Sequence, residues 1–208
     1  MELEQLARAF CAERCDVAAM DRLASFAAML AEENARQNLV SDASLARVWE
    51  RHLADSLQLL DHVPRGTLAD WLDLGTGAGF PGLVIAIAQP QRVVTLVESR
   101  KRRVEFLQRV CDSLGLGQCR VLGSRLENVP DFPAGVISAR AFAPLGKLLE
   151  LSARVSTPET VWLLPKGRSG AQELASQPAE VRALFHVEQS QTDPEAAIIT
   201  GQGRPPAA

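Results

Sequence analysis

The run from Leu68 to Gly82 (LADWLDLGTGAGFPG) constrains the fold of this chain more than any other stretch. Its apolar first half, around Asp73, ends abruptly in glycines at positions 75, 77, 79 and 82. This order predicts a buried strand, a tight turn and the start of a helix. Glycine suits such a turn because, without a Cβ, it adopts positive φ and lets a ligand approach the backbone. The apolar segment 82–88, with Pro81 at its start, would be a buried helix whose first free N–H groups point at whatever fills the turn.

Two nucleotide-binding patterns overlap in this turn. Gly77, Gly79 and Gly82 form G-x-G-x-x-G, and Glu98 follows 21 residues after Gly77, as a dinucleotide-binding fingerprint requires. Asp73 followed by glycines at 75, 77 and 79 instead resembles the first motif of S-adenosylmethionine-dependent methyltransferases. That resemblance implies that Asp73 orients the loop, the loop faces the methionine end of the cofactor, and Glu98 holds the ribose hydroxyls. A glycine turn that binds nothing is the third interpretation.

Length and charge set limits on the function. The 208 residues are enough for one domain with a full core, and 23% charged residues indicate a globular chain. A net charge of −3 argues against nonspecific coating of nucleic acid, but it leaves room for a local basic patch. No apolar run is long enough to span a membrane and no signal peptide is evident, so we expect a cytoplasmic protein without a membrane partner. The four cysteines lack C-x-x-C spacing, and we expect packing thiols and no metal site.

The order of periodic segments predicts an α/β fold. Helical periodicity covers residues 2–18, 21–37 and 44–60, and from Leu68 short apolar runs alternate with amphipathic segments. We expect strands at 92–98, 118–122, 135–138 and 160–164, a helix at 101–114, and two closing strands at 182–189 and 196–200. The parallel sheet closed by an antiparallel hairpin resembles the Rossmann-like class I methyltransferase fold. We therefore divide the chain into an N-terminal helical extension (1–63), a cofactor-binding domain (64–203) and a flexible tail (204–208).

Two further segments follow predicted strands. Ser124 to Glu127 comes after the third strand, where a methyltransferase of this class usually places the adenine; an ordinary loop capped by Ser124 is the alternative. Arg140 follows the fourth strand, so it would face the crevice at the carboxyl ends of the strands. Its guanidinium could bind a carboxylate or phosphate through two parallel hydrogen bonds, which a lysine could not.

Six motifs occur in the same order as in one bacterial family. They are Asn38-Leu39-Val40-Ser41, Arg51-His52-x-x-Asp55-Ser56, Gly75-Thr76-Gly77-Ala78-Gly79-Phe80-Pro81-Gly82, Ser124-Arg125-x-Glu127, Ala139-Arg140-Ala141 and Pro165-Lys166-Gly167. Over nearly its whole length the chain resembles the RsmG (GidB, glucose-inhibited division protein B) family, which methylates guanine N7 in the 530 loop of 16S rRNA. It departs at Ser41, where threonine is usual, and at Pro165 before the lysine.

The resemblance implies roles for individual residues. The cofactor set comprises Asp73, Gly75, Gly77, Gly79, Phe80, Glu98, Ser99, Leu126, Glu127 and Arg140, with S-adenosylmethionine as the cofactor. Candidates for positioning the substrate are His52, Arg140 and Lys166, although His52 and Asp55, one helical turn apart, also fit a packing pair. No acid or base is assigned, because guanine N7 already carries a free lone pair.

The candidates for binding RNA are four cations at the start of a predicted helix, Arg100, Lys101, Arg102 and Arg103. The helix dipole disfavours positive charge there, and a nearby phosphate would relieve the repulsion. The alternative is that these side chains form an ordinary solvated face. The partner would be 16S rRNA or the assembling small subunit, and we expect a monomer.

Two other classes of protein compete with this interpretation. An NAD-dependent oxidoreductase would need a hydride-site group, yet the chain contains no tyrosine and no second domain for a substrate. A non-catalytic ribosome-binding module would have no need to keep Asp73, the glycine loop, Glu98 and Arg140 together. Separate titrations with S-adenosylmethionine and NAD would distinguish these classes.

Overall fold

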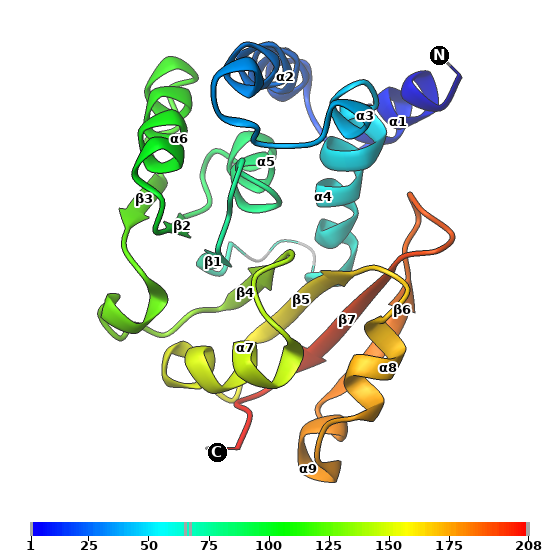
Figure 1. Cartoon of the computed structure of the whole chain (residues 1–208), viewed down its shortest axis with the longest axis vertical. Helices are drawn as coiled ribbons and strands as arrows, with labels where there is room; N and C mark the ends of the chain where they lie inside the picture. The colour runs from blue at the N-terminus through cyan, green and yellow to red at the C-terminus, as the bar shows by residue number, and fades with distance from the viewer. Residues whose placement is uncertain (1, 65, 67, 207–208) are drawn as a thin grey trace.

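The computed structural model describes residues 2–64, 66 and 68–206, and a seven-stranded sheet in the order β3-β2-β1-β4-β5-β7-β6 forms its centre (Figure 1). The strands are β1 (Trp71–Leu74), β2 (Val94–Glu98), β3 (Cys119–Gly123), β4 (Val136–Ala139), β5 (Val161–Lys166), β6 (Phe185–Gln189) and β7 (Ala197–Gln202). Strands β1 to β5 pair in parallel, whereas β7 is antiparallel to both β5 and β6. The predicted parallel sheet with a closing antiparallel hairpin is confirmed.

The register brings the site-bearing residues to one edge of the sheet. Leu74 at the end of β1 pairs with Val97 on β2 and with Ala139 on β4. The residues that follow these three positions therefore emerge side by side at the carboxyl ends of the strands. This edge is where open α/β sheets bind ligands.

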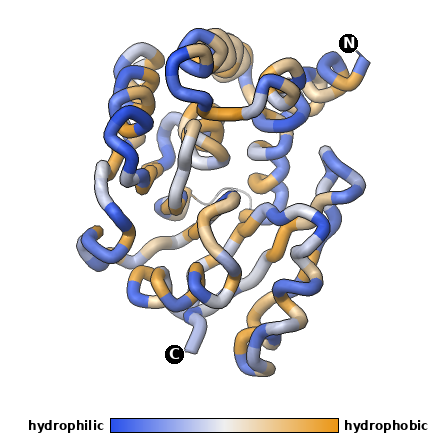
Figure 2. Tube along the Cα trace, viewed as in Figure 1, coloured by the Kyte–Doolittle hydropathy of each residue, from blue (hydrophilic) through white to orange (hydrophobic). Residues whose placement is uncertain are grey.

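Helices cover both faces of the sheet. In Figure 1 the first group lies above it and the second lies below it. The first group comprises α1 (Glu2–Ala12), α2 (Val17–Gln37), α3 (Asp42–Leu45), α4 (Asp55–Leu57), α5 (Gly82–Ala88) and α6 (Lys101–Ser113), and the second α7 (Leu145–Ser152), α8 (Gly170–Ala175) and α9 (Ala179–Arg182). Each group encloses its own apolar cluster against the sheet. Figure 2 shows hydrophobic and hydrophilic residues alternating along α2 and α6, as expected for helices with one buried face.

The helical boundaries differ from the predicted ones for local reasons. Helix α2 begins at Val17 because the carboxylate of Asp16 accepts a hydrogen bond from the Ala19 amide at 2.7 Å, which caps the helix. The predicted helix over 44–60 is broken into α3, a π-helical turn at Trp49–Ala54, α4 and a 3₁₀ turn at Gln58–His62. Helices α7 to α9 were not predicted, because one or two turns carry too little periodicity to be recognised in a sequence.

The two ends of the chain are tied to the domain. Leu23, Phe26 and Leu30 of α2 are fully buried in the cluster that also contains α5 and α6. Near the other end, Arg204 donates a hydrogen bond to the Ser156 carbonyl at 2.8 Å. The division at residues 63/64 and the flexible tail stay predictions, and residues 1, 207 and 208 of these segments lie outside the described residues. In the described part of the chain, no helix is both long and apolar enough to cross a membrane.

Candidate active site

Asp73 anchors the glycine loop from beneath. Its side chain is completely buried in β1, where one oxygen accepts a hydrogen bond from Ser138 Oγ at 2.6 Å and the other from the Gly82 amide at 2.9 Å. Trp71 Nε1 donates to the same Ser138 hydroxyl at 2.7 Å. Burial raises the pKa of Asp73 to about 6, although the hydrogen bonds from Ser138 and Gly82 oppose this shift. The carboxylate thus joins β1, β4 and the start of α5, and it organises the loop without lining a cavity.

The amide of Gly82 corrects one expectation about the loop. The helix was expected to direct its first free N–H groups at a ligand, but Gly82 donates to Asp73 and Leu83 donates to the Gly79 carbonyl at 2.9 Å. The reason is burial, since an amide enclosed beneath the loop needs a partner inside the protein.

The glycines of the loop divide into two kinds. Gly75 and Gly77 have φ values of +63° and +60°, and Gly75 lines a cavity at the carboxyl ends of the strands. A Cβ on Gly79 would lie 2.9 Å from Leu83, and one on Gly82 would lie 2.4 Å from Leu96. Gly79 and Gly82 are therefore required by packing against buried side chains, whereas the bare Cα of Gly75 lies beneath the Phe142 ring, and a Cβ there would lie 2.4 Å from Phe142 Cδ2.

The cavity beside Gly75 has a volume of about 370 Å³. We call it the smaller cavity. Its walls come from the ends of β1 and β2 and from the loops after β3 and β4, and the predicted cofactor residues along it are Gly75, Glu98, Ser99, Leu126 and Glu127. The structure thus brings together residues that are 52 positions apart in the chain (from 75 to 127).

Glu98 is held firmly at the wall of the smaller cavity. One carboxylate oxygen accepts from the amides of Ser99 and Arg100, both at 2.8 Å, and the other accepts from the Gly77 amide at 3.1 Å. Arg103 Nη1 lies 3.8 Å from the second oxygen. These donors fix the position of the carboxylate at the lip of the glycine loop.

The other five predicted cofactor residues, Asp73, Gly77, Gly79, Phe80 and Arg140, do not line this cavity. The Phe80 side chain is 2% exposed and packs between Phe26, at 5.5 Å between ring centroids, and His52, at 4.6 Å. Any contact of Phe80 with a cofactor would therefore use its backbone. Arg140 lines a second, larger cavity of about 840 Å³ instead.

The larger cavity lies between the helical N-terminal part and the closing strands. Its lining includes the ionisable residues Arg51, His52, Asp55, Arg140, Lys166 and Arg168. All three predicted substrate-positioning residues, His52, Arg140 and Lys166, line it. The π-helical turn over 49–54 carries the first of them, and such turns are frequent at functional sites.

Arg140 is the centre of the polar cluster in this cavity. Its guanidinium donates to His52 Nδ1 at 3.1 Å, Asp55 Oδ2 at 3.3 Å and the Arg51 carbonyl at 3.4 Å. It also lies 4.9 Å from the centroid of the Phe80 ring. Burial lowers the pKa of Arg140, and the carboxylate of Asp55 opposes that shift. His52 and Asp55 thus both accept hydrogen bonds from Arg140. Their spacing in the sequence alone did not indicate this shared partner.

The contact with Arg140 fixes the tautomer of His52. An arginine cannot accept a hydrogen bond, so His52 Nδ1 is the acceptor and the proton of the neutral ring is on Nε2. That Nε2 is buried without a hydrogen-bond partner among the described residues. Burial, together with the charges of Arg140 and Arg51, lowers the pKa of His52 to about 3.

The other cations of the larger cavity are paired with carboxylates. Lys166 Nζ donates to Glu173 at 2.8 Å, Arg51 binds Asp193, and Arg168 binds Glu195. Lys166 is the most enclosed of the three, with 11% of its side chain exposed. An anionic ligand would have to share or displace these carboxylates, which favours a ligand of specific shape over indiscriminate binding of phosphate.

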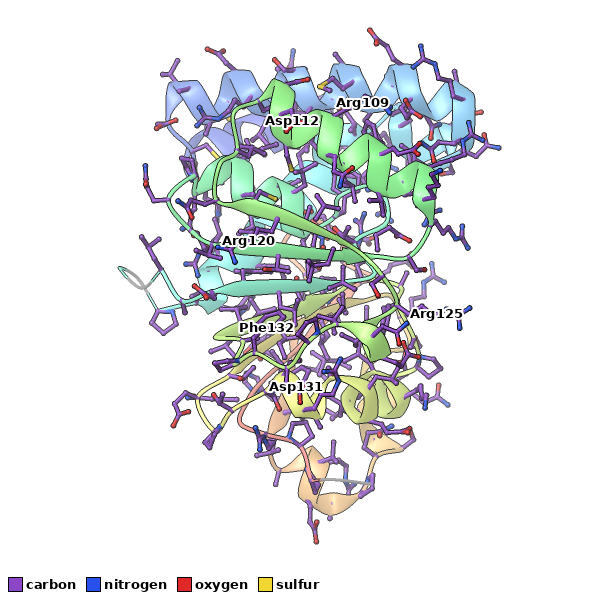
Figure 3. The ribbon with its side chains drawn as sticks, turned by 90° about the vertical axis from the view of Figure 1, so that its left-hand side faces the viewer. Arg109, Asp112, Arg120, Arg125, Asp131 and Phe132 are labelled. Atoms are coloured by element: carbon purple, nitrogen blue, oxygen red, sulfur yellow. The ribbon has the colours of Figure 1, made fainter. Side chains whose placement is uncertain are left out.

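The four cations predicted to bind RNA do not act as one group. Arg103 lies beside Glu98 in the smaller cavity, and Arg100 also lines that cavity. Arg102 donates to the Arg36 carbonyl at 2.9 Å, while the Lys101 side chain is 90% exposed. Figure 3 shows three further arginines on the face that carries α6 and β3: Arg109 on α6, Arg120 on β3 and Arg125 beyond the end of β3.

Ala141 and Phe142 were missed by the sequence analysis, yet they line both cavities. They directly follow Arg140, so the rule that places residues after a strand near the crevice would have included them. The direction of the Phe142 ring depends on Ala141, whose φ is +54°. No sequence signal indicates a left-handed alanine.

The environment of His52 predicts a pH-dependent stability. The folded pKa of about 3 lies below the ordinary value of 6.5, so the unfolded chain binds a proton first and the stability falls as the pH drops below 6.5. Between pH 7.5 and pH 5, His52 is expected to lower the free energy of unfolding by about 2 kcal/mol. Asp73, with a pKa raised from 3.8 to about 6, acts in the opposite direction over this interval.

Denaturant unfolding of the parent and of His52→Gln at both pH values isolates the His52 contribution, because Asp73 is present in both proteins. His186→Gln, on the exposed face of β6, controls for the loss of a histidine. If His52→Gln keeps the pH dependence of the parent, His52 is not a buried neutral ring.

The comparisons with known proteins agree with this geometry. The family model described as "GidB: rRNA small subunit methyltransferase G" matches residues 19–196. The chain is 61% identical over 201 residues to "Ribosomal RNA small subunit methyltransferase G" of Erythrobacter litoralis (strain HTCC2594), with 97% of each chain covered. It is 55% identical to the protein of the same description from Novosphingobium aromaticivorans, covering 92% of this chain and 85% of that one.

A solved structure supports the fold. The structure described as a SAM-dependent methyltransferase from Aquifex aeolicus matches with a TM-score of 0.55 and 17% identity, covering 79% of this chain and 95% of that one. Its low identity shows the architecture alone, while the family match extends over most of the chain. The chain therefore belongs to the GidB family of small-subunit rRNA methyltransferases, and it is an enzyme that uses S-adenosylmethionine.

Proposed function

We propose that this protein transfers a methyl group from S-adenosylmethionine to N7 of a guanine in the 530 loop of 16S rRNA. The observation that carries the proposal is the pair of cavities that meet at Ala141 and Phe142. The smaller would hold the adenosine part of the cofactor, and the larger would receive the guanine. The resemblance of the six ordered motifs to one family supports the choice of nucleotide.

The residues of the smaller cavity fit the cofactor. Glu98 presents a carboxylate whose oxygens already accept backbone N–H groups and can also accept hydrogen bonds from ribose hydroxyls. Leu126, 2% exposed, supplies an apolar surface for a base, and the bare Cα of Gly75 permits close approach of the remainder. A volume of about 370 Å³ lies in the range of small-molecule sites.

The proposed reaction needs alignment rather than proton transfer. S-adenosylmethionine supplies an electrophilic methyl group on a sulfonium, and guanine N7 carries a free lone pair at neutral pH. No residue has to remove a proton. Catalysis then depends on holding the two reactants in line and keeping water out.

The larger cavity is suited to holding the base. Arg140 and Lys166 carry donors that suit the O6 acceptor of guanine or a phosphate, and the neutral His52 adds one further N–H. Because Arg140 is already bound to His52 and Asp55, its guanidinium is held in place before substrate arrives. Such preorganisation avoids an ordering cost when the base enters.

Docking of the RNA is assigned to the amino end of α6. This helix begins with Lys101, Arg102 and Arg103 and has no acidic residue in its first turn, although the helix dipole disfavours cations there. Phosphate near Arg100, Lys101 and Arg102 would relieve that repulsion. The partner would be 16S rRNA or an assembling small subunit in the cytoplasm, and the protein would act as a monomer.

The test is the chemical state of one nucleotide. Ribosomal RNA from a strain lacking this protein is expected to lose a single N7-methylguanine in the 530 loop, and the purified enzyme should restore it. N7 methylation puts a fixed positive charge on the base and weakens the glycosidic bond, so borohydride and aniline treatment cleaves the RNA there. A cleavage pattern identical in deletion and parent strains would contradict the rRNA assignment and leave the cofactor site unaffected.

A further inference from the structure

The two cavities are separated by one aromatic side chain. Ala141 and Phe142 are the described residues that belong to the linings of both. The proposed reaction requires the methyl carbon to pass from a sulfonium on one side to a base nitrogen on the other. The reacting atoms must approach to roughly 3–3.5 Å, so the space between them has to be continuous.

The Phe142 ring rests directly on the cofactor loop. A Cβ built on Gly75 would lie 2.4 Å from Phe142 Cδ2 and 3.3 Å from both Cγ and Cε2. The ring therefore covers the bare Cα of Gly75, which is the part of the loop that a ligand would approach most closely. In this position it occupies the junction through which the two reactants must meet.

The backbone at Ala141 and Phe142 is held by few interactions. Ala141 has a φ of +54°, a left-handed conformation that is strained for a residue with a Cβ. The amides of Ala141 and Phe142 have no hydrogen-bond partner among the described residues. The flanks are fixed, because Arg140 is bound to Asp55 and the Leu145 amide donates to Glu173 at 3.3 Å. A short unbonded segment between two anchored ends can rotate without disturbing either.

We propose that Phe142 is a positioning residue with two states. Its ring covers Gly75 before the cofactor binds, and it then swings into the larger cavity, where it stacks on the target guanine. The inference rests on the proposed function, since it names the surface that holds the base at that same site. Stacking of a base on an aromatic ring contributes about 5- to 150-fold in affinity. The affinity gained by stacking can therefore offset the contacts that the ring loses when it leaves Gly75.

The two states predict effects of opposite sign on the two ligands. Phe142→Ala is expected to bind S-adenosylmethionine about threefold more tightly, because no ring has to leave Gly75. The same variant is expected to raise the KM for small subunits from a strain lacking the protein about tenfold, with a smaller change in kcat. Phe142→Tyr, which keeps the ring, should restore both values to within about twofold. Calorimetry with S-adenosylmethionine alone gives the first value, and methyl-transfer kinetics give the others.

Phe132 provides a matched control. Like Phe142 it is half-buried against the cluster beneath α7, but it lies in the loop before β4 and lines neither cavity (Figure 3). Phe132→Ala should leave both cofactor affinity and KM near those of the parent. If Phe142→Ala does not fold, Phe142→Leu removes the ring at smaller cost in packing.

The outcomes separate this inference from the proposed function. Weaker cofactor binding in Phe142→Ala, or an unchanged KM for the RNA substrate, overturns the two-state role. The calorimetric measurement with S-adenosylmethionine contains no RNA, so its result does not depend on which nucleotide the enzyme methylates. Should the parent enzyme modify another position of the rRNA, the proposed function fails, and the KM comparison is made on that position instead.

Discussion

Gly75→Val is expected to lower the affinity for S-adenosylmethionine on the order of 300-fold while leaving the protein folded. Gly75 has a φ of +63° and lines the smaller cavity, so a branched Cβ both strains the backbone and enters the space assigned to the cofactor. Left-handed strain contributes about 1–2 kcal/mol and overfilling of the site about 1–3 kcal/mol. The measurement is calorimetric titration, with circular dichroism to verify the fold.

Gly115→Val separates the two causes. Gly115 follows α6 with a φ of +64°, and nothing lies within 4 Å of the Cβ it would gain. Gly115→Val therefore reports the backbone strain alone and should keep the parental affinity for the cofactor. Gly75→Val carries the same strain and also displaces the Phe142 ring, whose Cδ2 would lie 2.4 Å from the new Cβ, and only this variant should lose the cofactor. Parental affinity in a folded Gly75→Val protein would mean that the cofactor does not lie against Gly75, and the smaller cavity would no longer be its site.

Arg140→Lys is expected to reduce kcat/KM for the RNA substrate about 100-fold and to change the affinity for S-adenosylmethionine less than threefold. The planar guanidinium reaches His52, Asp55 and the Arg51 carbonyl together, and a single ammonium cannot keep that arrangement. The cofactor should be affected little because Arg140 lines the larger cavity. Asp55 retains donors from Gln58 at 2.9 Å and Thr192 at 3.0 Å, so the lysine variant should fold.

Arg14→Lys is a matched control, because Arg14 lines neither cavity. Arg14 also binds a carboxylate, that of Asp61 at 2.7 Å, a backbone carbonyl, that of Phe10 at 3.0 Å, and it stacks over the Phe10 ring. It should lose comparable local interactions without loss of activity. Arg140→Lys could instead weaken cofactor binding and leave the KM for RNA unchanged. That result would contradict the substrate role and would show that Arg140 binds the cofactor, which is the other role that the family resemblance implies.

The proposed role of the larger cavity would account for recognition of RNA by a protein with a net charge of −3. Its cations are paired with Asp55, Glu173, Asp193 and Glu195, so the cavity does not attract every phosphate chain. Specificity would come from the shape of the extruded base and from Arg140. Guanine N7 is inaccessible in the deep, narrow major groove of an RNA helix, so a loop nucleotide is the appropriate substrate.

The fold was predictable because its signals are local. An apolar run around Asp73 that ends in glycines specifies a strand and a turn, and the alternation of such runs with amphipathic segments specifies a parallel sheet. The closing hairpin was also predicted, although β7 extends to Gln202 rather than ending at Thr200. The short helices α7 to α9 were not, since their positions depend on the sheet face that they cover.

The location of the cofactor site could also be predicted from the sequence, because it depends on where each strand ends. Gly75 follows β1, Glu98 is the last residue of β2 and Leu126 follows β3, and the carboxyl ends of parallel strands meet at one edge. The sequence therefore predicted that these residues lie together, and they line one cavity. Their roles toward the cofactor stay predictions until the variants above are measured.

The sequence by itself determined which segments form the strands, the turn that needs glycine, and the family to which the motifs belong. Only the tertiary structure decided which side chain faces which cavity. Arg140 meets His52 across 88 positions of chain, Arg103 turns toward Glu98, and Phe142 covers Gly75. Backbone periodicity and turn chemistry are set by neighbouring residues. Side-chain direction in a crevice is set instead by contacts between elements that the folding of the whole sheet brings together.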